Sequence, residues 1–201
     1  MNRNELPEMN AGSMADIAFL LLIFFLVTTT MSVDSGILRK IPQKQPLVEK
    51  IVIKDKNILE IIINKKNELF VDGGIVPIKE LKQIAIDFID NGGGTNKQGK
   101  PCNWCNGKKL TTSSEHPSKA FISIKTDRAT TYETYISVLD HVNSAYANLR
   151  NKLSLQLYNQ NYKRLLDDYK KSNYAEKVLQ NKINSIREKY PLLVSDAENN
   201  D

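Results

Sequence analysis

The stretch that decides the organisation of this chain is MADIAFLLLIFFLVTTTM, residues 14–31. Every residue from Ile17 to Val27 is apolar, and Asp16 is the only charged residue in the stretch. Eighteen helical residues extend over about 27 Å, close to the roughly 30 Å of a bilayer's hydrocarbon core, so we predict one transmembrane helix. A carboxylate at the edge of such a span costs roughly 2.5–3.5 kcal/mol to insert. We therefore expect Asp16 to be paired, hydrated or functional.

A cleaved signal peptide is the main alternative to an uncleaved span. It would need a basic start and a cleavage site with small residues. The start holds Arg3 against Glu5 and Glu8, and residues 28–32, Thr-Thr-Thr-Met-Ser, make a poor cleavage site. The sequence thus favours an uncleaved span after a short tail, residues 1–13. Taken alone, the excess of Lys and Arg over residues 39–50 would place the C-terminal part in the cytoplasm.

Helix capping is the structural alternative for Asp16. A carboxylate near a helix N-terminus gains about 0.3–1 kcal/mol from the helix dipole, which is less than the insertion cost. Ser13 could also provide the cap. At 100° per residue Leu20, Ile23, Val27 and Thr30 fall near the same side of the helix as Asp16, so this face is apolar between two polar ends, Asp16 and Thr30. Ser13 and Thr30 are the candidates for further polar residues along a proton pathway. A single span cannot form a water-filled path, so ion movement at Asp16 would need other helices.

The rest of the chain predicts a small α+β domain. Residues 32–50 form a linker interrupted by Gly36, Pro42 and Pro46. The domain, residues 51–148, has strand-like runs and two amphipathic helices. The runs cover residues 51–53, 58–63, 68–71, 75–76 and 120–125, and the helices begin at Ile78 and Tyr132.

Three further segments depart from that simple pattern. Residues 91–119 are polar and glycine-rich, and a structureless loop of that length is uncommon, so we interpret it as an insertion or a functional segment. Residues 149–191 are amphipathic and predict a helical extension that packs on the domain or on a partner. Residues 192–201 are expected to be a disordered tail.

Composition and motifs argue against a soluble enzyme. The net charge is +5, but the lysines are dispersed without interleaved aromatics, so no nucleic-acid partner is expected. Cys102 and Cys105 fit a structural disulfide or inert thiols, a redox pair, or a zinc site. Zinc needs four ligands and only His116 lies nearby, so no metal is expected. No Ser/His/Asp arrangement, phosphate loop or paired carboxylates stand out.

Three motifs in order resemble the ExbD/TolR family of proton-driven inner-membrane proteins, with MotB more distant. The first runs from Glu8-Met9-Asn10 to Met14-Ala15-Asp16-Ile17, and the second from Val33-Asp34 to Ile41-Pro42. The third runs from Ile122 to Glu133 and contains Asp127 and Tyr132. The chain departs from the family at Gly12-Ser13, where Thr-Pro is frequent, and in its insertion and extension.

The resemblance implies a single-pass inner-membrane protein with a cytoplasmic N-terminus and a periplasmic domain. This orientation is the opposite of the one that the Lys and Arg residues at 39–50 would predict alone. It implies that two copies of the span lie inside a pentamer of an ExbB-type partner. Asp16 would carry protons across the membrane. Protons would be the coupling ion, and no cofactor is implied. The expected function is to couple the proton motive force to TonB-dependent transport across the outer membrane through a TonB-like partner. The alternatives are a TolR-like component of the Tol-Pal system and a membrane-anchored periplasmic binding module. A secreted thiol-disulfide protein is the weakest interpretation.

Overall fold

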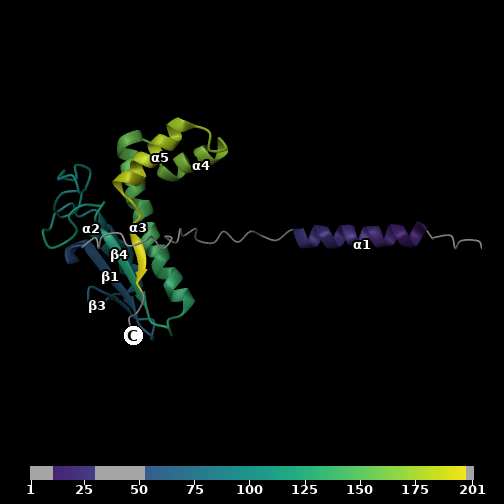
Figure 1. Ribbon diagram of the computed structural model, residues 1–201, viewed down its shortest axis with the longest axis horizontal. Coiled ribbons are helices and arrows are strands. Elements are labelled where there is room, and N and C mark those ends of the chain that lie inside the picture. Colours follow the sequence, from purple (N-terminus) through teal and green to yellow (C-terminus); the bar gives the residue numbers. More distant parts are fainter. Residues whose placement is uncertain (1–10, 30–52, 198–201) are drawn as a thin grey trace, which may run out of the picture. The chain divides into compact units, whose positions relative to one another are not determined.

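The computed structural model describes residues 11–29 and 53–197 (Figure 1). The chain divides into two units, residues 1–50 and residues 51–201, which are described separately.

In the first unit one helix is described, α1 (Ala11–Thr29). Its large side chains from Met14 to Leu26 are 41–63% exposed, and they are distributed around the whole helix. A helix that is apolar on all sides is typical of a buried or membrane environment. The side chains of Ala11, Ser13 and Val27–Thr29 lie outside the description. Over the residues that are described, no helix is long and apolar enough to cross a membrane. The helix itself is confirmed as far as Thr29, and its crossing of a membrane stays a prediction.

The second unit contains a mixed five-stranded sheet in the order β3-β2-β1-β4-β5. Its first three strands are antiparallel neighbours, whereas β1, β4 and β5 run parallel. This sheet, together with its helices, confirms the predicted α+β class. The strands are β1 (Ile58–Ile63), β2 (Leu69–Val71), β3 (Gly74–Ile75), β4 (Phe121–Thr126) and β5 (Val194–Ala197).

The strands form where apolar, mostly β-branched residues alternate between the two faces of the sheet. Leu59, Ile61 and Ile63 of β1 are at most 2% exposed, while the residues between them are half-buried. The predicted turn at Asp72-Gly73 is confirmed, and both residues have positive φ, at 48° and 82°. Turns of that conformation join adjacent antiparallel strands because their twist matches that of the sheet.

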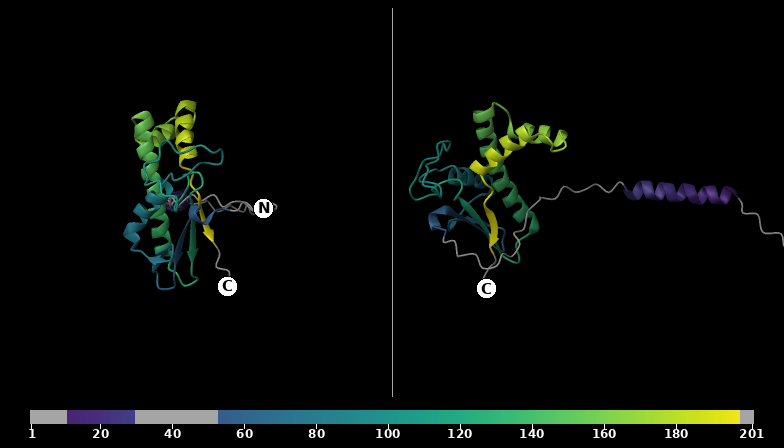
Figure 2. Two further views of the ribbon diagram at one scale, coloured as in Figure 1. Left: turned by 90° about the vertical axis from the view of Figure 1, so that its left-hand side faces the viewer. Right: turned by 45° about the horizontal axis from the view of Figure 1, so that its top comes forward.

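Two helices, α2 (Ile78–Ile89) and α3 (Tyr132–Tyr158), lie against one face of the sheet (Figure 2). Pro77 occupies the position before the first turn of α2, and the Thr131 side chain accepts a hydrogen bond from the Thr134 N–H at the start of α3. The core between these helices and the sheet contains fully buried side chains such as Leu81 and Val142.

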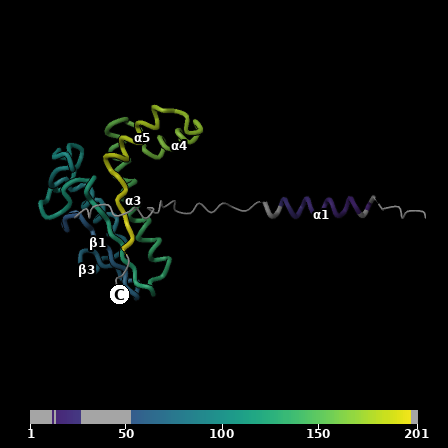
Figure 3. The backbone as a smooth tube through the Cα atoms, in the orientation of Figure 1, coloured from purple at the N-terminus to yellow at the C-terminus, as the bar shows by residue number. Residues whose placement is uncertain are grey.

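The C-terminal part differs from the sequence-based prediction in two places. The predicted boundary at residue 149 falls inside α3, because Leu149 and Leu153 continue the buried stripe of that helix. Two shorter helices follow, α4 (Tyr162–Lys171) and α5 (Lys177–Lys189). Figure 3 follows the chain from α5 back to the sheet, where β5 pairs with β4. The prediction of disorder from residue 192 is therefore wrong for Val194–Ala197.

The start of the domain also differs from the prediction of a strand at residues 51–53. Ile51 and Val52 lie outside the described residues, and Ile53 belongs to no strand. A short 3-10 helix, η1 (Asp55–Asn57), leads instead into β1. The physical reason is long-range: the buried Asn57 side chain accepts a hydrogen bond from the Glu115 N–H, and this contact fixes the chain just before β1.

Candidate functional site

Asp16 lies in the second turn of α1, because the helix begins at Ala11. No acidic residue occupies the first turn, so the position expected for a capping carboxylate is not the one that Asp16 holds. Asp16 is exposed, and so are Leu20 and Ile23 on the same side of the helix, at 59% and 41%. This face therefore presents one carboxylate followed by apolar surface, which suits contact with lipid or with other helices.

Most of the other residues predicted around the span lie outside the described part of the chain. Ser13 belongs to α1, but its side chain lies outside the description. Asn10, Thr30, Asp34 and Pro42 also lie outside the described residues. Their predicted roles stay predictions.

The third family motif forms a tight turn between β4 and α3. The Asp127 carboxylate accepts a hydrogen bond from the Ala129 N–H at 2.9 Å, and the Asp127 carbonyl accepts one from the Thr130 N–H at 3.0 Å. The Thr130 hydroxyl donates to the carbonyl of Ile63 at the end of β1, at 3.2 Å. These hydrogen bonds hold the start of α3 at the end of β1, so the motif positions this helix relative to the sheet.

Tyr132, the other predicted residue of this motif, is 76% exposed at the first position of α3. Its ring lies 6.4 Å from the ring of Tyr135, whose hydroxyl donates to the Asp196 carboxylate on β5. The structure therefore places Asp127 in the turn before α3 and Tyr132 at the start of that helix, near β5, while Asp16 belongs to the other unit.

The insertion, residues 91–119, is ordered although it is almost free of helix and strand. The buried Asn91 amide donates to the carbonyls of Leu110 and Ser114, at 2.8 and 2.7 Å, and its oxygen accepts from the Leu110 N–H. A Cβ atom at Gly93 would collide with the Leu110 carbonyl. Close backbone packing therefore requires glycine at position 93.

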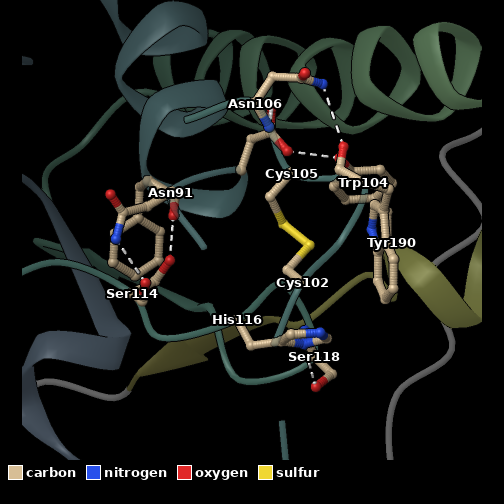
Figure 4. Close-up of a disulfide and its surroundings, with 11 residues drawn as sticks. Asn91, Cys102, Trp104, Cys105, Asn106, Ser114, His116, Ser118 and Tyr190 are labelled. Atoms are coloured by element: carbon tan, nitrogen blue, oxygen red, sulfur yellow. Dashed lines mark hydrogen bonds between the residues drawn. A yellow bond between two sulfur atoms is a disulfide. The ribbon is translucent and has the colours of Figure 1, made fainter. Parts of the chain in front are cut away.

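Cys102 and Cys105 form a disulfide inside this insertion, with both residues at most 8% exposed (Figure 4). In this state neither sulfur is a thiolate that could bind zinc. The pair lies in an irregular segment between α2 and β4, and no helix begins at it. A thioredoxin-like redox site would have a helix there. The structure thus favours the structural role among the alternatives left by the sequence.

Trp104, between the two cysteines, connects the insertion to the C-terminal part. Its ring lies edge-to-face with His116, with ring centroids 5.4 Å apart, and the Lys189 ammonium of α5 lies 4.0 Å from its centroid. The next residue, Tyr190, donates a hydrogen bond from its buried hydroxyl to the Asp90 carboxylate at 2.6 Å. The insertion and the end of α5 therefore pack on each other.

His116 is 3% exposed, and its Nδ1 accepts a hydrogen bond from the Ser118 N–H. A neutral ring then carries its proton on Nε2, which has no hydrogen-bond partner within the described part of the chain. Burial, followed by the charges of Lys119 and Lys189, lowers the pKa of His116. The folded domain therefore holds this ring in its neutral form.

A prediction for pH dependence follows from this lowered pKa. Below pH about 6.5 the unfolded chain protonates this imidazole and the folded chain does not, so stability falls as the pH decreases. The slope approaches about 1.4 kcal/mol per pH unit for one proton. Urea unfolding between pH 7.5 and 5 should show this loss, and His116→Gln should flatten it. The matched control is His141→Gln; an equal flattening there would contradict the assignment.

Sequence reasoning missed Glu115, whose side chain is 9% exposed and surrounded by three lysines. Its carboxylate pairs with Lys54 at 2.8 Å, Lys56 at 3.1 Å and Lys119 at 2.8 Å. Hydrogen bonds from Lys119 first, and then from Lys54 and Lys56, hold the pKa of Glu115 far below its usual range. Residues 91–119 contain five lysines and one acidic residue, Glu115. This charge imbalance is the feature of the sequence that could have identified Glu115.

The comparisons with known proteins agree with the motifs of the sequence. The family model described as biopolymer transport protein ExbD/TolR matches residues 2–156, which is 155 of the 201 residues. The match ends near the end of α3, so α4, α5 and β5 lie beyond it. The comparison with curated proteins gives no match.

Proposed function

Because the chain belongs to the ExbD/TolR family of biopolymer transport proteins, we propose that it is the proton-carrying subunit of an ExbB-ExbD-type inner-membrane motor. The observation that supports this most is α1, a helix that is apolar on all sides, exposed, and interrupted by a single carboxylate. Such a helix needs lipid or other helices around it. The family provides the context in which both are present, with residues 14–31 as the span.

In this proposal two copies of α1 lie inside a ring of partner helices, and Asp16 takes up a proton from the periplasmic side and releases it to the cytoplasm. An apolar wall of the ring favours the neutral carboxyl group, whereas the charged carboxylate needs a polar one. One charge that crosses about 100 mV contributes roughly 2.3 kcal/mol, so a few protons could drive one rotational step. Alternate protonation of the two Asp16 side chains would produce stepping.

The second unit would transmit the resulting force to a TonB-like periplasmic partner. The turn at Asp127 supports this role, because it joins β1, β4 and the start of α3 through backbone and side-chain hydrogen bonds. The packing of the insertion against α5 extends the same connected body to the C-terminal strand. A domain built in this way can pass on a displacement without local unfolding.

The proposal is tested by reconstitution of the full chain with its ExbB-type partner in vesicles that carry a membrane potential. A pH-sensitive dye inside the vesicles reports proton entry. We expect proton flux above that of vesicles containing the partner alone, and the flux should increase with the imposed potential. Flux equal to that of the partner alone would contradict the proposal.

A further inference from the structure

A cavity of about 390 Å³ lies where the start of the domain, the insertion and the C-terminal part meet. Its apolar wall is formed by three half-buried or exposed side chains: Ile53 from the start of the domain, Phe121 at the start of β4, and Leu193 just before β5. Asn57 and Ser118 add polar atoms to the lining. The volume suits one or two side chains of a ligand and is small for a lipid's acyl chains.

Lysines surround this apolar wall and exceed the acidic groups beside it. Lys54, Lys97 and Lys119 line the cavity, and Glu115 is the acidic residue in the lining. Glu115 is already saturated by Lys54, Lys56 and Lys119, so three cations share one anion. The cluster therefore keeps two positive charges in excess before Lys97 is counted.

Lys97 adds a third unbalanced positive charge at the cavity. It is exposed and forms no ion pair with the described acidic residues. The insertion as a whole has five lysines against one glutamate, which makes residues 91–119 net +4. The cavity is thus complementary to a ligand that combines an apolar group with negative charge.

We propose that this cavity binds an extended peptide segment of a periplasmic partner, in which a carboxylate side chain stands beside apolar side chains. The apolar side chain would occupy the wall of Ile53, Phe121 and Leu193, and the carboxylate would meet the ammonium group of Lys97. A small inorganic anion would leave the apolar wall unused, and a neutral hydrophobic ligand would leave the lysines unpaired. The inference rests on the proposed function for the source of the segment, a partner that the motor drives.

The position of the cavity gives such a segment a mechanical connection. Ile53 directly follows the chain that leads from α1, and Leu193 directly precedes β5. A segment bound there would contact the entry of the domain, the insertion and the link to the sheet edge together. Force transmitted through the chain that leads from α1 would reach the bound segment through the residues that hold it.

The test uses the full chain in lipid nanodiscs and a fluorescent hexapeptide in which leucine alternates with aspartate or glutamate. Fluorescence anisotropy measures its affinity, and a second peptide replaces each acid by its amide. We expect the amide peptide to bind at least about tenfold more weakly, and Lys97→Glu to weaken the acidic peptide by roughly five- to tenfold. Lys100→Glu is the matched control, because Lys100 is also exposed in the same insertion but does not line the cavity.

Several results would overturn the inference. Equal losses for Lys97→Glu and Lys100→Glu would show general attraction to a basic surface, and equal affinities for the two peptides would show that charge is not recognised. Full displacement of the peptide by phosphatidylglycerol vesicles would assign the cavity to a lipid headgroup. Asp16→Asn should leave the affinity unchanged, which separates this site from the proton pathway. Normal proton flux without peptide binding would therefore overturn the cavity's role and leave the proposed function standing.

Discussion

Asp16→Asn is expected to reduce proton flux through the reconstituted complex to the level of vesicles that contain the partner alone. Asparagine is close to aspartate in size and shape but has no carboxyl group that can take up and release a proton. The variant should still form the complex, because the apolar surface of α1 from Met14 to Leu26 is unchanged. Flux is measured with the dye assay at a fixed membrane potential, and complex formation by co-purification of the partner.

The same substitution separates the proton-carrying role from helix capping. Asparagine and aspartate are about equally good N-cap residues, so a capping role predicts that Asp16→Asn is silent. Asp16 also lies five residues after the first residue of α1, beyond the first turn. A cap is therefore disfavoured by position as well as by the cost of inserting the charge.

Two companion variants complete this experiment. Asp16→Glu retains an exchangeable proton on a longer side chain, so we expect it to keep a reduced but measurable flux. Asp140→Asn removes an exposed carboxylate from α3 in the other unit and should leave the flux unchanged. Unchanged flux and unchanged transport in Asp16→Asn would refute the proposed mechanism.

The sequence predicted those elements whose residues carry a local pattern. The apolar run at Ile17–Val27, the alternation in β1 and the helical spacing from Ile78 each appear in the structure as helix or strand of the expected kind. The turn at Asp72-Gly73 likewise follows from residues that tolerate positive φ. In these cases neighbours along the chain determine the conformation.

The missed elements depend on contacts between residues far apart in the sequence. Strand β5 consists of Val194-Ser-Asp-Ala, which has no apolar alternation, and it forms because parallel pairing with β4 satisfies its backbone groups. The Glu115 cluster joins Lys54 and Lys56 to a residue about 60 positions later. No local spacing could have predicted either arrangement.

The second large effect is expected when the chain is ended after Asn159. The family match stops at residue 156, which suggests that the remainder is an appendage. The structure indicates the opposite, because the removed part contributes six large buried side chains to the single core cluster of the domain. They are Tyr162, Leu165, Leu179, Ile183, Ile186 and Tyr190.

Each fully buried side chain of this size contributes about 1.5–3 kcal/mol, and the truncation also exposes Leu149, Leu153 and the edge of β4. Ordering the removed residues costs conformational entropy, which offsets part of the stabilisation that their burial provides. We therefore expect the truncation to lower the free energy of unfolding by about 5 kcal/mol or more. That loss is comparable to the whole stability of a typical domain. The truncated domain should therefore show no cooperative unfolding transition in urea.

Trp104 provides the measurement, because it is the only tryptophan in the chain and contacts Lys189 of α5. In the truncated chain its fluorescence should be shifted to the red before any urea is added. Ending the chain after Ala197 is the control and should preserve the transition. Tyr190→Phe removes one hydrogen bond to Asp90 and should lower the free energy of unfolding by about 1–3 kcal/mol.

If the chain that ends after Asn159 had a free energy of unfolding within about 1 kcal/mol of that of the full chain, α4, α5 and β5 would be separable from the domain. If instead the domain unfolds, lost function on deleting residues 149–191 cannot distinguish an anchored binding module from an energy transducer. Asp16→Asn then remains the variant that can.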